Sequence, residues 1–161
     1  MRSIAISNQK GGVGKTTTAL NLGYILAGKG YKTLLVDMDP QASLSQALGV
    51  TAAATLADVL GDSRPGRLTI DKIITPITED LHLAPADLSL SNTELGLTAR
   101  MGRENVLKKV LASLTGYDLV IIDCPPSLGV LSINALVAAD AVISPTPPDS
   151  MGKRGLSLFL T

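Results

Sequence analysis

Short apolar runs alternate with segments of helical periodicity along the whole chain. A continuous apolar run bounded by turn residues is typical of a buried strand, and apolar positions three and four apart are typical of a helix. Strands are predicted in this way at 3–7, 33–36, 70–74, 81–84, 119–122 and 141–143, and helices at 16–29, 43–48, 55–60, 103–114 and 127–138. This alternation predicts an α/β fold, with a mostly parallel sheet and helices on both faces.

Local signals refine the ends of these elements. Gly30 and Gly116 follow two of the helical segments and are expected to end them. Ser91 and Glu94 have the spacing of a capping box, in which each side chain bonds the backbone of the other residue. We expect a loop over 61–66 (GDSRPG) and the start of a further helix over 155–161.

The composition indicates one domain with an aliphatic core. The 161 residues are 45% hydrophobic but only 2% aromatic, and 14 basic residues balance 14 acidic ones. Zero net charge disfavours nucleic-acid binding by bulk charge, although it allows a local basic patch. No run approaches the ~20 apolar residues of a membrane span. The first residues are not typical of a signal peptide. The expected location is therefore the cytoplasm, with no membrane contact.

A glycine-rich segment, KGGVGKTT (10–17), lies between the first predicted strand and the first predicted helix. Its glycines allow the backbone to curl so that several N–H groups point at one anion, and the following helix N-terminus favours negative charge there. Lys15 can reach the outer phosphates of a nucleotide, and the Thr16 hydroxyl can ligate Mg²⁺. The predicted nucleotide-binding residues are Lys10, Gly11, Gly12, Val13, Gly14, Lys15, Thr16 and Thr17.

This segment departs from the strict phosphate-binding loop. Gln9 stands where the strict pattern has glycine, and Lys10 is an additional lysine just before the paired glycines. Taken alone, Lys10 fits a solvated surface position. Within this motif it is predicted to contact the phosphates, with a neighbouring subunit as one source of the contact.

Three carboxylates follow predicted strands. Asp37 and Asp39 come directly after the run 34–36, and Asp123 ends the run 119–122. Ligands of open α/β sheets bind at the carboxyl ends of the strands. Two carboxylates two residues apart can serve Mg²⁺ and an attacking water separately. The metal site is predicted to use Thr16, Asp37 and Asp123.

Two residues with potentially reactive side chains, Cys124 and His82, are not expected to be catalytic. Cys124 has no histidine near it in sequence, so a small buried residue is expected rather than a nucleophile. A single cysteine also excludes an internal disulfide, and cannot alone hold zinc or an iron–sulfur cluster. His82, the only histidine, lies in a predicted strand without a surrounding motif.

Four segments together resemble the ParA/MinD family of deviant Walker ATPases: NQKGGVGKTTTALNLG (8–23), LLVDMDPQAS (34–43), YDLVIIDCPPSLG (117–129) and SINALVAADAVI (132–143). The first two favour its ParA-like partition branch. The resemblance implies a P-loop NTPase-like fold whose C-terminal part is absent. The segment 1–161 would be a single ATPase domain, the N-terminal two-thirds of the family domain. Segment 145–156 matches the family only loosely.

Roles carried over from the family are specific to single residues. Asp39 would be catalytic by positioning the hydrolytic water, and Lys10 would reach across a dimer to the partner's nucleotide. Asp37 and Asp123 would support the magnesium shell. The implied cofactors are ATP and Mg²⁺. The implied partners are a second copy of the chain, non-specific DNA and a stimulating ParB-like or adaptor protein, with nucleoid association when ATP is bound.

The expected function is therefore a slow, partner-stimulated ATPase that partitions or positions DNA or a large cargo. A MinD-like membrane-associated regulator of cell division is the alternative, and it needs a C-terminal amphipathic helix. A reductase like the nitrogenase iron protein needs more cysteines than one per chain supplies. A nucleotide switch without hydrolysis would differ by showing negligible turnover. Cargo, partner identity and the residues that contact adenine or DNA are not predicted.

Overall fold

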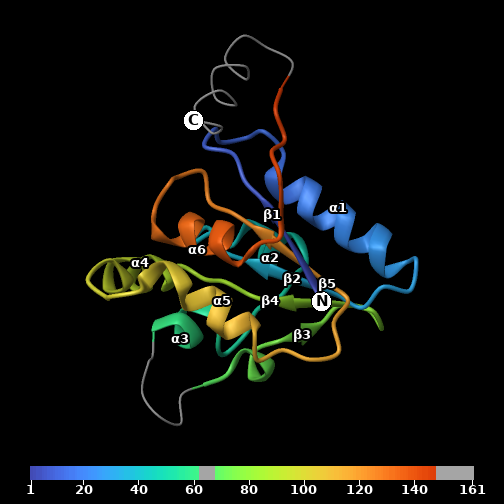
Figure 1. Ribbon diagram of the computed structural model, residues 1–161. Coiled ribbons are helices and arrows are strands. Elements are labelled where there is room, and N and C mark those ends of the chain that lie inside the picture. Colours follow the sequence, from blue (N-terminus) through green and yellow to red (C-terminus); the bar gives the residue numbers. More distant parts are fainter. Residues whose placement is uncertain (62–67, 148–161) are drawn as a thin grey trace.

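A six-stranded sheet forms the centre of the computed structural model, which describes residues 1–61 and 68–147 (Figure 1). The strand order is β3-β4-β2-β5-β1-β6, and only β3 runs antiparallel to its neighbour. The strands are β1 (Arg2–Ile6), β2 (Thr33–Asp37), β3 (Thr75–Pro76), β4 (Leu81–Ala84), β5 (Leu119–Asp123) and β6 (Ala141–Ile143). The predicted mostly parallel sheet is confirmed.

Helices cover both faces of this sheet, as predicted (Figure 1). One face packs against α1 (Lys15–Ala27) and α2 (Ser43–Ala47). The other face packs against four helices, which are α3 (Leu56–Gly61), α4 (Leu90–Thr98), α5 (Val106–Leu111) and α6 (Val130–Ala138). Two short 3₁₀ turns, η1 (Ile70–Lys72) and η2 (Arg103–Asn105), lie before β3 and α5.

The continuous apolar runs are explained by two cores rather than one. Leu35 of β2 and Ile121 of β5 face the core under α1, whereas Leu34 and Val120 face the core under α3 to α6. All four side chains are fully buried. Because successive side chains of a strand point to opposite faces, a strand covered on both sides needs apolar residues at every position.

The prediction of a strand at 70–74 is wrong. Ile70 begins η1, in which the Lys72 N–H donates to the Thr69 carbonyl and the Ile73 N–H donates to the Ile70 carbonyl, both at 3.1 Å. Ile70 and Ile73 are buried three residues apart, a spacing that suits one side of a 3₁₀ turn. In a run of only five residues, periodicity cannot distinguish a strand from a 3₁₀ turn.

The predicted capping box at Ser91 and Glu94 is also wrong. Helix α4 begins at Leu90, so Ser91 lies inside it, and Ser89 at the N-cap makes no capping bond with its side chain. Asp87 instead accepts a hydrogen bond of 3.0 Å from the Ser89 N–H. The correct signal was an aspartate two residues before the N-cap, which forms an Asx turn.

Other helix ends differ by a few residues. Helix α1 ends at Ala27, α5 ends at Leu111 with η2 forming the start of the predicted 103–114 helix, and α6 begins at Val130. The predicted stops Gly30 and Gly116 both take positive φ in the turns that follow. The loop expected at 61–66 lies outside the described residues except for Gly61, which ends α3, and the helix expected at 155–161 lies outside them entirely.

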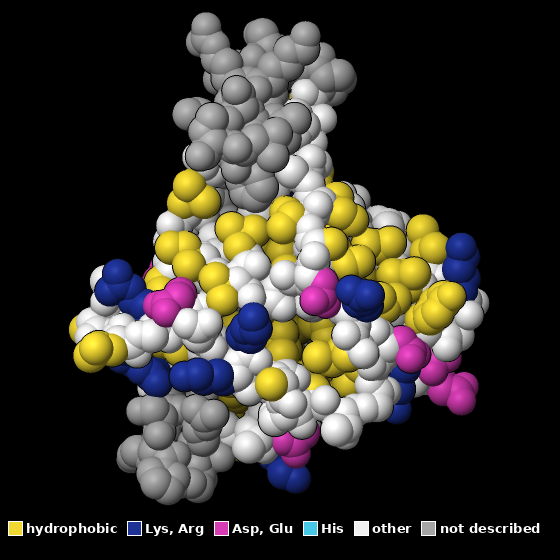
Figure 2. Space-filling model, viewed as in Figure 1, with side chains coloured by type: hydrophobic (Ala, Val, Ile, Leu, Met, Phe, Trp, Pro, Cys, Tyr) yellow, Lys and Arg dark blue, Asp and Glu magenta, His cyan; other side chains and the backbone are white. Residues whose placement is uncertain are grey.

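Strand β6 lies at the edge of the sheet beyond β1. Its Val142 and Ile143 side chains, and Tyr24 and Ile25 of α1, are between 38% and 56% exposed. Figure 2 shows hydrophobic side chains gathered over this part of the molecule, where β6 and α1 lie. An uncovered edge strand flanked by apolar side chains is typical of a surface that another polypeptide segment covers.

The closest approach between α1 and the sheet occurs at Gly23. A Cβ atom placed there would lie 2.8 Å from Leu35 Cδ2 and 3.2 Å from Leu81 Cδ1. We predict that Gly23→Ala lowers the free energy of unfolding by about 2 kcal/mol, because an added methyl group overpacks a filled core. Urea denaturation measures the change.

Gly96→Ala in α4 is the matched control, because nothing lies within 4 Å of its added Cβ. Alanine's better helix propensity is expected to leave that variant as stable as the wild type or slightly more stable. Equal stability of Gly23→Ala and the wild type would contradict the packing described for α1.

Candidate functional site

Three neighbouring strands end together at one edge of the sheet. In the registers of β2, β5 and β1, Asp37 lies beside Asp123, and Asp123 lies beside Ile6. The glycine-rich loop leaves the sheet just beyond Ile6 and leads into α1. The predicted loop and the predicted carboxylates therefore meet at this edge, as expected for the carboxyl ends of parallel strands.

The loop backbone has the conformation that its glycines permit. Gly12 and Gly14 have φ of 71° and 89°, in the left-handed region that side chains disfavour. Gly14 is also the N-cap of α1, and no side chain bonds the first N–H groups of this helix of 13 residues. Those N–H groups and the helix dipole form an electropositive end that suits a phosphate.

The side chain of Lys15 closes the loop on itself. Although charged, it is only 7% exposed, and its Nζ donates a hydrogen bond of 3.2 Å to the Lys10 carbonyl. A buried ammonium with one neutral acceptor retains donors for an anion. The role of Lys15 as a cation that binds phosphates stays a prediction.

Sequence reasoning missed Asn8, which fixes the start of the loop. Its Oδ1 accepts a hydrogen bond of 2.9 Å from the Lys10 N–H, and its Nδ2 donates one of 2.9 Å to the Pro145 carbonyl. Asn8 is buried and thus joins the loop to the segment after β6. An asparagine directly after a strand is a recognisable Asx-turn signal, but its distant partner Pro145 left no local trace.

A cavity of about 330 Å³ opens between the loop and the end of β2. This volume lies at the lower end of the range for small-molecule sites. Its lining combines predicted residues with Ser43 and Pro126, which were not predicted; the lining residues are Gly11, Gly12, Gly14, Lys15, Thr16, Thr17, Asp39, Ser43 and Pro126. Lys10, Val13, Asp37 and Asp123 are not among the residues that line it.

Asp37 is fully buried but has hydrogen bonds to both oxygens. Oδ2 accepts 2.8 Å bonds from both the N–H and the hydroxyl of Ser45, and Oδ1 accepts one of 3.2 Å from the Asp39 N–H. Burial raises the pKa of Asp37, and the Ser45 bonds oppose that increase. Ser45, another residue that the sequence did not reveal, therefore stabilises the charged form.

Asp123 is buried without such compensation. Neither carboxylate oxygen has a hydrogen-bond partner by distance and angle, although the nearby Thr16 hydroxyl and the Lys15 charge lower the pKa in part. Burial, with smaller contributions from Asp37 and Asp39, raises the pKa of Asp123 to about 7. A buried carboxylate in this state is expected to gain most from a bound cation.

The donor set around Asp123 fits Mg²⁺. Carboxylate and hydroxyl oxygens are the ligands that Mg²⁺ prefers, and it usually takes one or two of them together with phosphate oxygens and water. Within residues 1–61 and 68–147, no group of three or more His, Cys, Asp or Glu side chains could hold a metal alone. A metal at this site would therefore be shared with a phosphate ligand.

Asp39 lies at the cavity, and a strained turn holds it there. Its Oδ1 accepts a 2.9 Å bond from the Gln41 N–H, and its carbonyl accepts one of 2.8 Å from the Ala42 N–H. Ala42 has φ of 53° and is the only non-glycine residue of the described part of the chain with positive φ. Such strain is often found at functional sites.

Cys124 follows Asp123 and is 1% exposed. Burial raises the pKa of its thiol to about 12, so the thiol stays protonated at neutral pH. The prediction that Cys124 is a structural residue rather than a nucleophile agrees with this environment.

Comparison with known proteins gives the family. A family model described as an AAA domain matches residues 1–161, which is the whole chain. The chromosome-partitioning ATPase Soj of Treponema pallidum is 43% identical over 162 residues. The chain belongs to the ParA/MinD family of P-loop ATPases. The fold class and the family predicted from the motifs are confirmed.

Other ParA/MinD relatives show the same extent of similarity. The sporulation initiation inhibitor protein Soj of Bacillus subtilis is 45% identical over 161 residues and matches 98% of this chain. The match to the Treponema pallidum protein covers 99% of this chain. The chain spans 62% of the length of each of these two relatives.

Solved structures of ParA/MinD-like folds match closely. Cobyrinic acid a,c-diamide synthase from Mycobacterium smegmatis, with a bound ATP analog and magnesium, has a TM-score of 0.92 at 42% identity; the match covers 99% of this chain and 66% of that one. The ATP complex of a Cyanothece McdA variant has a TM-score of 0.89 at 32% identity, over 99% and 62% of the two chains. The predicted cofactors, ATP and Mg²⁺, agree with these bound ligands.

The bonds between Ser45 and Asp37 allow a direct test of the site's architecture. We predict that Ser45→Ala lowers the free energy of unfolding by about 2 kcal/mol, because it leaves a buried carboxylate with one fewer donor. It also removes the acceptor of a 3.1 Å bond from the Ala86 N–H. Urea denaturation at neutral pH measures the difference.

Ser91→Ala is the control, since Ser91 is an exposed serine of α4. Its stability is expected to stay within ~0.5 kcal/mol of the wild type. If Ser45→Ala matches Ser91→Ala in stability, Ser45 does not support Asp37 in the way described.

Proposed function

We propose that this chain is the ATP-binding part of a Mg²⁺-dependent, dimerising ATPase that partitions or positions DNA or another large cargo. One observation carries the proposal: the phosphate-binding loop, Asp39 and Pro126 line one cavity, beside a buried carboxylate, Asp123, that lacks hydrogen bonds. The names of the relatives, which are chromosome-partitioning proteins, support the cargo class.

The glycine-rich loop would bind the phosphates of the nucleotide. The free N–H groups at the start of α1 would donate to phosphate oxygens, with the Lys15 ammonium turned toward the outer phosphates. The Thr16 hydroxyl and Asp123 would hold Mg²⁺, and Asp37 would support the magnesium shell from the next strand. The metal, when bound, would neutralise charge on the phosphate oxygens.

Hydrolysis would depend on Asp39. From the cavity wall, its carboxylate would accept a hydrogen bond from the attacking water and orient it toward the γ-phosphorus. The bond from phosphorus to the bridging oxygen then breaks, which leaves ADP and inorganic phosphate. Slow turnover suits a switch whose conformations differ by contacts to the γ-phosphate.

Dimerisation and partner binding complete the proposal. Lys10 would reach the nucleotide of a second copy, which explains a lysine in the loop that does not line the cavity of its own chain. The ATP-bound dimer would bind non-specific DNA on the nucleoid, and a ParB-like or adaptor protein would stimulate hydrolysis. In its other state the protein would be cytoplasmic.

The MinD-like membrane regulator stays the alternative function. No helix within residues 1–61 and 68–147 is both long and apolar enough to cross a membrane. Co-sedimentation of the full-length protein with DNA or with liposomes, in the presence of Mg-ATP, distinguishes the two functions. We expect the protein to sediment with DNA in an ATP-dependent manner.

The role of Asp39 yields the main functional prediction. Asp39→Ala is expected to bind ATP within ~3-fold of the wild type but to hydrolyse it about 100-fold more slowly, because the attacking water loses its partner. Calorimetric titration and phosphate release measure the two properties. Turnover at the wild-type rate would show that Asp39 does not position the water.

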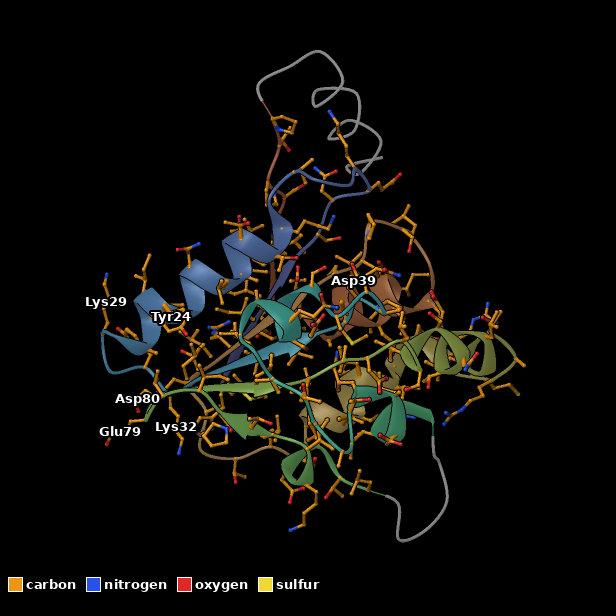
Figure 3. The ribbon with its side chains drawn as sticks, turned by 180° about the vertical axis from the view of Figure 1, so that it is seen from behind. Tyr24, Lys29, Lys32, Asp39, Glu79 and Asp80 are labelled. Atoms are coloured by element: carbon orange, nitrogen blue, oxygen red, sulfur yellow. The ribbon has the colours of Figure 1, made fainter. Side chains whose placement is uncertain are left out.

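Two further variants control this experiment. Lys15→Ala is expected to weaken ATP binding by about 100-fold, because a charge-assisted contact to phosphate is lost. Glu79→Ala removes an exposed carboxylate in the turn before β4, away from Asp39 (Figure 3), and is expected to change neither property.

A further inference from the structure

A second cavity lies at the opposite end of the sheet from the phosphate-binding loop. It has a volume of about 550 Å³ and is formed by four separate segments, which contribute Lys32 before β2, the stretch 69–76, His82 of β4 and the stretch 113–117 before β5. Figure 3 shows Lys32 at the margin of the molecule, well away from Asp39. None of the residues assigned to ATP binding lines this cavity.

A preformed polar pair lies in this cavity. The Tyr117 hydroxyl and His82 Nδ1 are 2.6 Å apart, and their rings meet edge to face with centroids 5.5 Å apart. His82 also has a hydrogen bond to the Glu79 backbone, which opposes part of the fall in its pKa. Burial, aided by the Lys32 charge, lowers the pKa of His82, which keeps the imidazole neutral at pH 7.

Lys32 is the only cation among the residues that line the cavity, and the Asp118 carboxylate accepts a 2.9 Å hydrogen bond from its backbone N–H. The Lys32 ammonium lies 5.9 Å from the centre of the Tyr117 ring, and no carboxylate of the described residues lies within ion-pair distance of it. The one carboxylate in the lining, Asp71, is paired at 3.3 Å with Lys72. A hydrogen bond from the Thr69 side chain further lowers the pKa of Asp71. Lys32 is therefore the charge available to a ligand.

Part of the lining is apolar. Ile74 and Leu114 are half-buried and pack against the core under α3 to α6, so their outer surfaces continue that core into the cavity. A flat apolar body fits against such a wall, and an acidic group at its end would face Lys32. A single lysine without a glycine-rich loop suits a carboxylate better than a phosphate dianion, which needs more donors.

We propose that this cavity binds a small aromatic carboxylate, with the carboxylate on Lys32 and the ring between Tyr117 and the Ile74–Leu114 wall. Such a ligand would contact the segments that lead into β2 and β5, whose far ends hold Asp37 and Asp123. The site is independent of the proposed ATPase function, since no residue belongs to both.

The single histidine of the chain provides a selective probe. Benzoate is titrated into the protein in saturating Mg-ADP, which occupies the nucleotide cavity, and the His82 imidazole signals are followed by NMR. The expected result is a shift that saturates with benzoate concentration. In Lys32→Gln the affinity for benzoate is expected to be at least about 5-fold weaker, because the charge-assisted contact is lost. Lys29→Gln, an exposed lysine that does not line the cavity, should bind benzoate like the wild type.

Three outcomes would overturn the proposal. These are a shift that does not saturate, equal benzoate affinity in Lys32→Gln and the wild type, and an equal response to uncharged benzyl alcohol or to inorganic phosphate. Because Lys32 is exposed, Lys32→Gln is expected to unfold in urea like the wild type, which separates lost binding from lost folding.

Discussion

The parallel pairing of β2 with β5 is the constraint on which the rest of the site depends. It places Asp37 beside Asp123 at the end of two buried strands, where removal from water raises the pKa of both carboxyl groups. Ser45 compensates the first carboxylate with two hydrogen bonds, whereas the second has none. This asymmetry is the reason why we propose Asp123 as a magnesium ligand, together with Thr16 and a nucleotide at the phosphate-binding loop.

Two apolar cores keep this arrangement rigid. Leu35 and Ile121 pack under α1, and Leu34 and Val120 pack under the other helices, so neither strand can shift without disturbing both cores. A one-residue slip of β2 would turn Asp37 to the opposite face and bring the wrong side chains to both cores. The same packing that excludes water from the strands thus fixes the register that makes the carboxylates neighbours.

Features with local causes could be predicted from the sequence. Continuous apolar runs revealed the central strands, and the glycine spacing before Lys15 revealed the loop, because glycine is the residue that readily takes the positive φ of Gly12 and Gly14. Features that depend on a partner far away in the sequence could not be predicted. Asn8 bonds a carbonyl 137 positions away, and the role of Ser45 depends on how α2 packs beside β2. The prediction of a strand at 70–74 was wrong because periodicity in so short a run does not distinguish a strand from a 3₁₀ turn.

The central claim is that the buried charge of Asp123 is uncompensated until Mg²⁺ and a nucleotide bind. Urea unfolding of the wild type and of Asp123→Asn, each with and without Mg-ATP, tests it most directly. Without ligand, the variant is predicted to be as stable as the wild type or more stable, because a buried unpaired charge is removed. With Mg-ATP, the wild type is predicted to gain more stability than the variant, since ligand binding stabilises in proportion to the logarithm of affinity. A variant that is destabilised without ligand, yet gains as much from Mg-ATP as the wild type, would contradict the account.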